Sequence, residues 1–510
     1  MFDESFAFPP ALVNRVGGSS GRVAVIGAGV AGLVCAYELQ RCGFQVVLYE
    51  RSRQPGGRVR THRFWDGTHA DLGAMRIPGN HHCVLHYVSR FGLRTRPFVN
   101  ANPSAYYHLR GHRVRARDVH ALFPEFALRD AEKQAPTRLL DRLLGAVWET
   151  LTTGQKRRVL EGHWDDPALD RLISVSLWQF VHENLSQDAW DLVGHASGLA
   201  HYEQSSLLEV LVDYFGLFHA GQLELVDGMD SLTRAFVRAL RPRTLQLSTN
   251  ISELVLTGEG VLVRGRRMDH PTTEQVDFVV CCVPAPALDQ ITFLPGLPHP
   301  QRHAVRGISY ASSSKSLLHL TRRRWESQDG IFGGGSFTDL PIQQCWYPSD
   351  NARPVRDGAD GSATLRWVAQ DPRRSEEPSV LLGAYLWGAN ARRAAALPPA
   401  DRDRLVLACL EQLHPGIGDD VDDIVHWNWD EQVGMGGGAF AHLPPGEHTR
   451  YLTVLGSPHP VGDPRIFFAG EHLSGAHAWC QGAAQSALGA VGLLLDRSRH
   501  AEVAARVGAA

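Results

Sequence analysis

The stretch that most constrains the fold covers residues 22–50, RVAVIGAGVAGLVCAYELQRCGFQVVLYE. It begins with a short apolar run at 23–26, and the glycine pattern GAGVAG follows at 27–32. A helical pattern comes next, and a second apolar run at 46–49 ends on Glu50. This order of strand, tight turn, helix and strand predicts a βαβ unit that binds a dinucleotide.

Each glycine of this pattern has a separate expected role. Gly27 allows the tight turn, Gly29 lets the backbone approach a pyrophosphate, and Gly32 lets the helix pack closely on the strand. The free N–H groups at the helix N-terminus then face the phosphates. Glu50 follows Gly32 by 18 residues, near the spacing expected of a carboxylate that accepts from ribose hydroxyls. The dinucleotide ligands predicted here are Gly27, Gly29, Val30, Ala31, Gly32 and Glu50.

Composition limits the other classes of function. The chain has 510 residues, enough for two or three domains, and a net charge of −3 gives no reason to expect a nucleic acid. We expect no membrane span, no signal peptide and no metal site, because no long apolar run, basic leader or metal-ligand spacing occurs. Eight cysteines without a CxxC motif favour free thiols and a cytoplasmic location.

The rest of the chain alternates between helical and strand-rich patterns. Apolar residues recur at helical spacing through 120–225, whereas 245–295 contains short β-type runs. Strands and loops mix through 305–440. A strand at 465–471 then precedes a helix of small residues over 478–495. The pattern indicates an α/β protein with a helical insertion.

Seven motifs give the chain a resemblance to a known family. In chain order they are GAGVAGL (27–33), PGGRVRT (55–61), ADLGAMRIP (70–78), VDGMDSL (226–232), GIFGG with FTDLP (330–341), MGGG (435–438) and FAGEHLSGAHAW (468–479). From about residue 20 to 495 the chain resembles a flavin-dependent L-amino acid oxidase of the flavin monoamine oxidase superfamily. The GGR and FAGE elements belong to the whole superfamily. LGAMRIP, VDGMD and AHAW point to the amino acid oxidase branch.

The resemblance implies three interleaved parts. A discontinuous Rossmann-like FAD-binding domain would comprise 20–65, 227–307 and 455–500. A substrate domain on a mixed sheet would comprise 66–118 and 308–454, and a helical domain would comprise 119–226.

The resemblance also implies the cofactor and its ligands. Gly438 stands where covalent amine oxidases carry a cysteine, so the FAD should be non-covalent. The helix from Ala478 should direct its N-terminal dipole at the flavin. The predicted cofactor-binding residues are Gly27, Gly29, Val30, Ala31, Gly32, Glu50, Arg51, Gly57, Arg58, Gly73, Ala74, Met75, Arg76, Ile251, Trp429, Gly470, Glu471, Ala478, Trp479 and Ala483.

The resemblance also implies which residues recognise the substrate. Arg76 should hold an α-carboxylate through its guanidinium fork, and Tyr385 should add a hydroxyl. The alternatives are an arginine paired with an acid and a core tyrosine. Lys315, the predicted catalytic residue, would hold a water near flavin N5; a lysine in an apolar strand is costly without such a role. The predicted substrate-binding residues are Arg76, Trp346, Tyr385, Gly438, Ala478 and Trp479.

The implied reaction is oxidative deamination of L-amino acids to 2-oxo acids, ammonia and hydrogen peroxide. Gly438, with Trp346 and Trp479 nearby, favours large hydrophobic or aromatic side chains. An amino acid 2-monooxygenase, an amine oxidase, a dehydrogenase and a flavoprotein without turnover remain alternatives. The expected partners are the amino acid, oxygen and a second copy of the chain in a dimer. His201 and His219 are candidates for a mobile histidine, although a solvated surface position is the more ordinary reading of each.

Overall fold

The computed structural model describes residues 21–218, 221–357, 364–432, 434–435 and 437–508. Its first layer is a five-stranded parallel sheet in the order β10-β2-β1-β14-β25. The strands are β1 (Arg22–Ile26), β2 (Gln45–Tyr49), β10 (Leu245–Gln246), β14 (Phe278–Cys281) and β25 (Ile466–Phe468). This sheet therefore draws strands from all three segments predicted to form the discontinuous domain.

Successive side chains of β1 point to opposite faces of this sheet, so each face packs against a different set of elements. Val23 and Val25 pack into one core with α2 (Val30–Arg41) and α17 (Cys480–Gly508). Ala24 and Ile26 pack into a second core on the opposite face. A four-stranded sheet covers that second face; it consists of β11 (Thr249–Thr257), β12 (Gly260–Arg267), β13 (His270–Val276) and β15 (Thr292–Leu294). Side chains that point to opposite sides of a strand thus define two separate cores.

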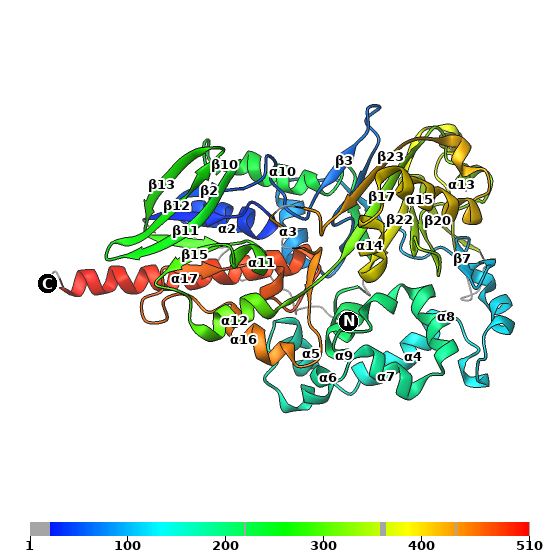
Figure 1. The fold of residues 1–510 in the computed structure, drawn as a ribbon, viewed down its shortest axis with the longest axis horizontal. Helices are drawn as coiled ribbons and strands as arrows, with labels where there is room; N and C mark the ends of the chain where they lie inside the picture. The colour runs from blue at the N-terminus through cyan, green and yellow to red at the C-terminus, as the bar shows by residue number, and fades with distance from the viewer. Residues whose placement is uncertain (1–20, 219–220, 358–363, 433, 436, 509–510) are drawn as a thin grey trace.

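The C-terminal helix differs from its expected bounds. It begins at Cys480 rather than 478, because Ala478 has a φ of 66°, which no right-handed helix contains. It ends at Gly508 rather than 495. Figure 1 shows this helix, in red, running under the parallel sheet toward the C-terminus. Among the described helices, none combines the length and the apolar character needed to cross a bilayer.

A seven-stranded mixed sheet forms the second layer, in the order β23-β17-β22-β19-β18-β7-β8. Its strands are β7 (Tyr106–Leu109), β8 (His112–Arg115), β17 (Ser313–Leu320), β18 (Gly334–Thr338), β19 (Gln344–Tyr347), β22 (Ser379–Trp387) and β23 (Val421–Asn428). The antiparallel register of β17 and β22 places Lys315 opposite Tyr385. Two predicted site residues are therefore neighbours through strand pairing alone.

The helical part has its own apolar core. It includes α4 (Pro136–Trp148), α5 (Thr153–Leu160), α7 (Leu177–Asn184), α8 (Gln187–Ser197), α9 (Leu207–Leu211) and a π-helix over Val212–Leu217. It lies below the mixed sheet in Figure 1. The last part of the segment expected to be helical is instead a strand, β9 (Gln222–Leu225), which pairs with β5 (Ile77–Pro78) and β6 (Thr95–Pro97). This pairing brings the end of the helical part beside the loop that carries Arg76.

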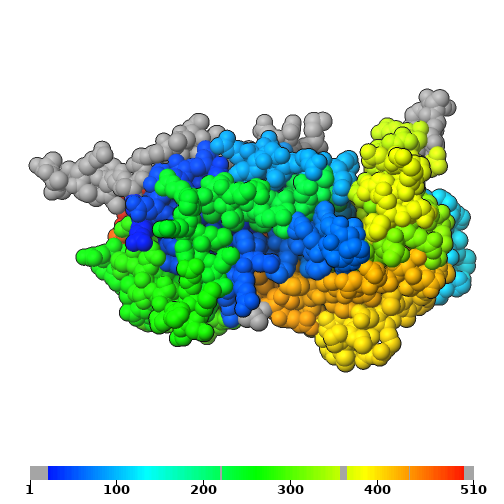
Figure 2. Space-filling view, turned by 90° about the horizontal axis from the view of Figure 1, so that it is seen from above, coloured from blue at the N-terminus to red at the C-terminus, as the bar shows by residue number. Residues whose placement is uncertain are grey.

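Seen from above, residues 21–100 connect the two large sheets. Figure 2 shows them in blue between the green β11–β13 region and the yellow and orange residues of the mixed-sheet half. The loop over residues 56–76 runs through this junction, so both halves can contribute to one site.

The glycine turn after β1 gives a test of local packing. A Cβ on Gly32 would lie 1.8 Å from the Gly27 carbonyl oxygen, whereas a Cβ on Gly29 would have nothing within 4 Å. Overpacking of this kind typically costs about 1–3 kcal/mol. We expect Gly32→Ala to lower the free energy of unfolding of the apoprotein by at least that amount, measured by urea denaturation. Gly29→Ala is the matched control and should unfold like the wild type. A Gly32→Ala protein as stable as wild type would contradict this packing role.

Candidate functional site

A single cavity of about 1360 Å³ lies between the two sheets and the helical part. Nearly all of the predicted site residues line it: Gly27, Gly29, Val30, Ala31, Glu50, Arg51, Gly57, Arg58, Gly73, Ala74, Met75, Arg76, Ile251, Lys315, Trp346, Tyr385, Trp429, Gly470, Glu471, Ala478, Trp479 and Ala483. The fold therefore gathers residues from five predicted segments around one space, which is large enough for a dinucleotide and a small substrate together.

Two predicted residues do not line the cavity. Gly32 lies beneath the turn and packs on Gly27, so its role is in packing rather than ligand contact. Gly438 is not among the residues that line the cavity, and a Cβ there would lie 2.7 Å from the Tyr310 Cβ and 3.1 Å from the Ala311 carbonyl oxygen, so its substrate-binding role stays a prediction. Gly438 faces this strand and not the cavity, and this position gives no support to the argument that it leaves room for a large side chain.

Glu50 organises the dinucleotide end of the cavity. Its two carboxylate oxygens accept 2.8 Å hydrogen bonds from the backbone N–H groups of Ala28 and Ser52. The carboxylate is buried and holds the glycine turn against the end of β2. Each carboxylate oxygen can accept a second hydrogen bond, so a ribose hydroxyl can still be bound. Gly29 presents bare backbone to the cavity at the N-terminus of α2. This combination fits a pyrophosphate beside a ribose.

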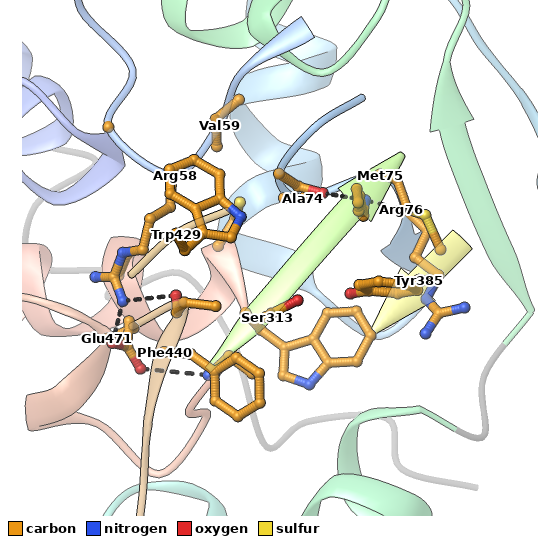
Figure 3. Close-up of a pocket in the computed structure, with 18 of the residues that line it drawn as sticks. Arg58, Val59, Ala74, Met75, Arg76, Ser313, Tyr385, Trp429, Phe440 and Glu471 are labelled. Atoms are coloured by element: carbon orange, nitrogen blue, oxygen red, sulfur yellow. Dashed lines mark hydrogen bonds and ion pairs between the residues drawn. The ribbon is translucent and has the colours of Figure 1, made fainter. Parts of the chain in front are cut away.

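An ion pair between Arg58 and Glu471 stands next to this cradle. Arg58 Nη1 donates to Glu471 Oε1 at 2.6 Å and to the Ala439 carbonyl at 3.1 Å. Glu471 also accepts from the backbone N–H groups of Ala441 and Ala478. Burial opposes the charge of Glu471, but Arg58 and the other donors outweigh it and lower the pKa of the carboxyl below its ordinary value. Figure 3 shows the pair at the opposite end of the pocket from Arg76.

Lys315 fixes the loop between these two ends. Its Nζ donates to the carbonyl oxygens of Asp71 at 3.0 Å and Gly73 at 2.7 Å. The ammonium also lies 4.7 Å from the centre of the Tyr385 ring. Burial lowers the pKa of Lys315 to about 7, with Asp71 opposing that shift and Arg76 adding to it. Lys315 therefore positions the loop 71–76, and its role in holding a water stays a prediction.

Arg76 is a cation outside any ion pair of the described residues, although the charge of Asp213 acts on it from farther away. In the described part of the chain its guanidinium forms no ion pair, and its side-chain partner is the Asn100 amide oxygen at 3.2 Å. The rings of Phe98, Phe218 and Trp346 surround it, with centroids 5.6, 4.6 and 5.1 Å from Cζ. Burial lowers the pKa of this arginine. Such a site favours an anionic ligand, and the alternative of a structural arginine paired with an acid does not apply here.

Tyr385 lies beside Arg76 at this end of the pocket, as Figure 3 shows. Its hydroxyl is protonated, because burial raises its pKa well above the ordinary value. It can therefore donate a hydrogen bond to the same anion that Arg76 binds. Lys315, Arg76 and Tyr385 together give this end of the cavity a surplus of donors.

Sequence reasoning missed several residues of this end. Asp213, on the π-helix, accepts a 2.7 Å hydrogen bond from Trp479 Nε1, and Phe218 follows on the same segment. Both lie in a stretch that reads as an ordinary amphipathic helix, and only the π-helical turn directs Asp213 into the cavity. Asn100 and Phe98 lie in an irregular loop much earlier in the chain, and the sequence of that loop shows no helical or strand periodicity.

His201 corrects the expectation of a solvated surface histidine. Its ring lies against the cavity and stacks on Trp387, with centroids 4.6 Å apart and planes 8° apart. Burial lowers the pKa of this histidine to about 3, so it is neutral. His219 lies outside the described residues.

The chain is similar to known proteins over most of its length. The chain is 29% identical over 484 residues to L-amino acid oxidase Bs29 of Bothriechis schlegelii, covering 91% of this chain and 88% of that one. It is likewise 29% identical to an L-amino-acid oxidase of Crotalus adamanteus over 489 residues, 92% of this chain and 85% of that one.

Solved structures share the fold. Cyclohexylamine oxidase from Brevibacterium oxydans superposes with a TM-score of 0.70 at 19% identity, covering 94% of this chain and 99% of that one. Putrescine oxidase superposes with a TM-score of 0.73 at 18% identity and the same coverage. The model of the flavin-containing amine oxidoreductases matches residues 30–495. The chain is thus an oxidoreductase that belongs to the family of flavin-containing amine oxidoreductases.

Proposed function

We propose that this protein oxidises L-α-amino acids to 2-oxo acids with release of ammonia and hydrogen peroxide. The observation that carries the proposal is the unpaired guanidinium of Arg76 beside Tyr385. A simple amine has no carboxylate that could neutralise the charge of Arg76. An enzyme that oxidises only simple amines therefore does not need this arginine. The names of the relatives, L-amino acid oxidases, support the same substrate class.

The residues of the cavity fit non-covalent FAD as the flavin. The N–H groups at the start of α2 and the bare backbone of Gly29 would hold the pyrophosphate, and Glu50 the ribose. Ile251, Trp429 and the Arg58–Glu471 pair line the remaining length of the cavity. When bound, the flavin supplies a two-electron acceptor for the hydride of Cα, which oxygen then regenerates.

The protein's own contribution is to orient the substrate. Arg76 binds the carboxylate bidentately and fixes its plane, and the Tyr385 hydroxyl donates a further hydrogen bond. Lys315 holds the loop 71–76 through two carbonyl groups, so Arg76 keeps its place relative to the cofactor. The aromatic rings around Arg76 exclude water and strengthen its attraction for the carboxylate. Positioning of this kind supplies a large part of the rate enhancement in bimolecular reactions.

Amino acid 2-monooxygenation is the second candidate, because it needs the same clamp on the carboxylate. The two reactions differ in their products, a 2-oxo acid against an amide one carbon shorter. A panel of L-amino acids, with the 2-oxo acid, the amide and peroxide each quantified, tests the proposal. Amide formation without 2-oxo acid would replace it.

Removal of the Arg76 guanidinium tests the substrate class. Loss of one member of a desolvated charge pair costs about 2–5 kcal/mol, or about 30- to 5000-fold in binding. We expect Arg76→Ala to lower kcat/KM for amino acids within that range and Arg76→Lys not to restore it, since lysine lacks the fork. Flavin content serves as the control and should stay near wild type. Equal turnover of an amino acid and its decarboxylated amine by the wild type would contradict the assignment.

Substitution of Glu50 tests the ribose contact. Glu50→Gln keeps the size of the side chain, but it removes the charge and one of the two acceptors that hold Ala28 and Ser52. A hydrogen bond to a charged group contributes about 1.5–3 kcal/mol, so FAD should bind about 10- to 150-fold more weakly. Titration of the apoprotein with FAD, followed by flavin fluorescence, measures this change. An unaltered dissociation constant would exclude Glu50 as a ligand.

Release of the flavin tests the non-covalent assignment. Two cysteines, Cys282 and Cys480, line the cavity, and burial raises the pKa of both thiols, to about 12 for Cys480. A protonated thiol is a poor nucleophile, so neither should attach to the flavin. We expect acid precipitation to leave all of the FAD in the supernatant. Yellow colour that stays with the denatured chain would show a covalent bond.

A further inference from the structure

The cavity contains a second charge outside any ion pair of the described residues, and its sign is opposite to that of Arg76, on which it acts from beyond ion-pair distance. Asp213 lines the cavity, and its carboxylate accepts a hydrogen bond from Trp479 Nε1 at 2.7 Å. The described residues supply it with no ion pair. Burial and Glu209 raise the pKa of Asp213 to about 6, with Trp479, Arg76 and Tyr202 opposing them. The carboxyl is thus ionised at neutral pH and lacks a cationic partner.

The other acids of the cavity lining are placed differently. Glu471 pairs with Arg58, Glu431 with Arg402, and Glu50 accepts from two backbone N–H groups. Asp141 is exposed and accepts from the Tyr214 hydroxyl. Glu50 and Asp213 both have only neutral donors beside them, but each Glu50 oxygen holds a backbone N–H group, whereas Asp213 accepts from the side chains of Trp479 and Tyr202. A carboxylate in that position is costly unless a ligand brings a cation.

Asp213 and Arg76 stand at the two ends of a short aromatic row. The Phe218 ring centroid lies 4.6 Å from Arg76 Cζ and 6.1 Å from the Trp479 ring, and the Trp479 indole donates to Asp213. An occupant that satisfies both charges must carry an anion and a cation separated by an apolar stretch. A basic amino acid has this form, with its carboxylate at one end and its side-chain cation at the other.

The α-amino group is a poorer partner for Asp213 than a side-chain cation. The α-nitrogen must lose its proton before Cα can give up a hydride. A carboxylate beside the ammonium would stabilise the protonated form and oppose that step. A cation several bonds from Cα can stay charged throughout the reaction, so it can pair with Asp213 without this penalty.

We propose that Asp213 binds the ammonium or guanidinium group at the end of the substrate side chain, so that basic L-amino acids are the preferred substrates. The proposal rests on the proposed function and makes its substrate class more specific. It replaces the expectation of large hydrophobic or aromatic side chains, one basis of which was Gly438. A neutral side chain would leave the Asp213 carboxylate without a cation at ion-pair distance, and sites built to bind a polar group strongly reject analogues that lack it.

Steady-state kinetics of the holoenzyme tests the proposal by measuring the preference for basic over neutral substrates. This preference is the ratio of the mean kcat/KM for L-arginine and L-lysine to the mean kcat/KM for L-leucine and L-phenylalanine. We expect the wild type to favour the basic pair and Asp213→Asn to lower the ratio about 100-fold, as for a truncated buried charge pair. Asp213→Glu keeps the charge and should retain part of the preference. Asp141→Asn is the matched control, because Asp141 also lines the cavity but is exposed and accepts from the Tyr214 hydroxyl. This substitution should leave the ratio within about twofold.

A binding measurement separates this proposal from the proposed function. The probes are 5-guanidinopentanoate and hexanoate, two carboxylates without an α-amino group, and the readout is the change in flavin absorbance. We expect the guanidino acid to bind more tightly to wild type and to lose that advantage in Asp213→Asn. This binding measurement decides the role of Asp213 even if the protein turns over no amino acid. The absence of turnover would refute the proposed function but not the role of Asp213.

Three results would overturn the role of Asp213. The first is a wild type that prefers leucine or phenylalanine. The second is an equal loss for all substrates in Asp213→Asn, which would indicate a contact with the α-amino group or a structural role. The third is a guanidino acid that binds no better than hexanoate.

Discussion

The ion pair between Arg58 and Glu471 joins two parts of the chain that are 413 positions apart. Glu471 also accepts from the backbone N–H groups of Ala441 and Ala478, so one segment near the start of the sequence and two from its last fifth meet at one carboxylate. Removal of either partner would leave a buried charge uncompensated, which typically costs about 3–5 kcal/mol. The position of the cavity walls relative to one another depends on this contact.

Patterns of neighbouring residues, such as turn glycines and alternating apolar side chains, predict the elements that local interactions determine. The unit over 22–50 appears with β1 and β2 within one residue of their expected bounds and with α2 beginning at Val30, inside the glycine pattern, because turn glycines and apolar alternation act locally. Arg76, Lys315 and Tyr385 were found through motifs, and they do line one cavity. The antiparallel pairing that brings Lys315 opposite Tyr385 could not have been read from either strand alone.

The residues that sequence reasoning missed or misplaced depend on tertiary structure. Asp213 reaches the cavity through a π-helical turn, and that turn has no distinct sequence pattern. Gly438 lies in a glycine-rich motif, yet the direction of its missing side chain is set by the path of the backbone against Tyr310. His201 is withdrawn from water because Trp387, from a distant strand, covers its ring. For Gly438 and His201 the deciding neighbour lies far away in the chain.

The strand order of the parallel sheet has a consequence for synthesis of the protein. β1 forms one of the first described elements, but its neighbour β14 begins at Phe278 and the edge strand β25 at Ile466. A ribosome that adds about 5–20 residues per second needs some tens of seconds to complete the sheet. β1 lacks its second partner until β14 has been made, and through the whole interval the sheet lacks β25 and the cofactor cradle lacks Glu471. The parallel sheet and the cradle can therefore be completed only when translation is nearly finished.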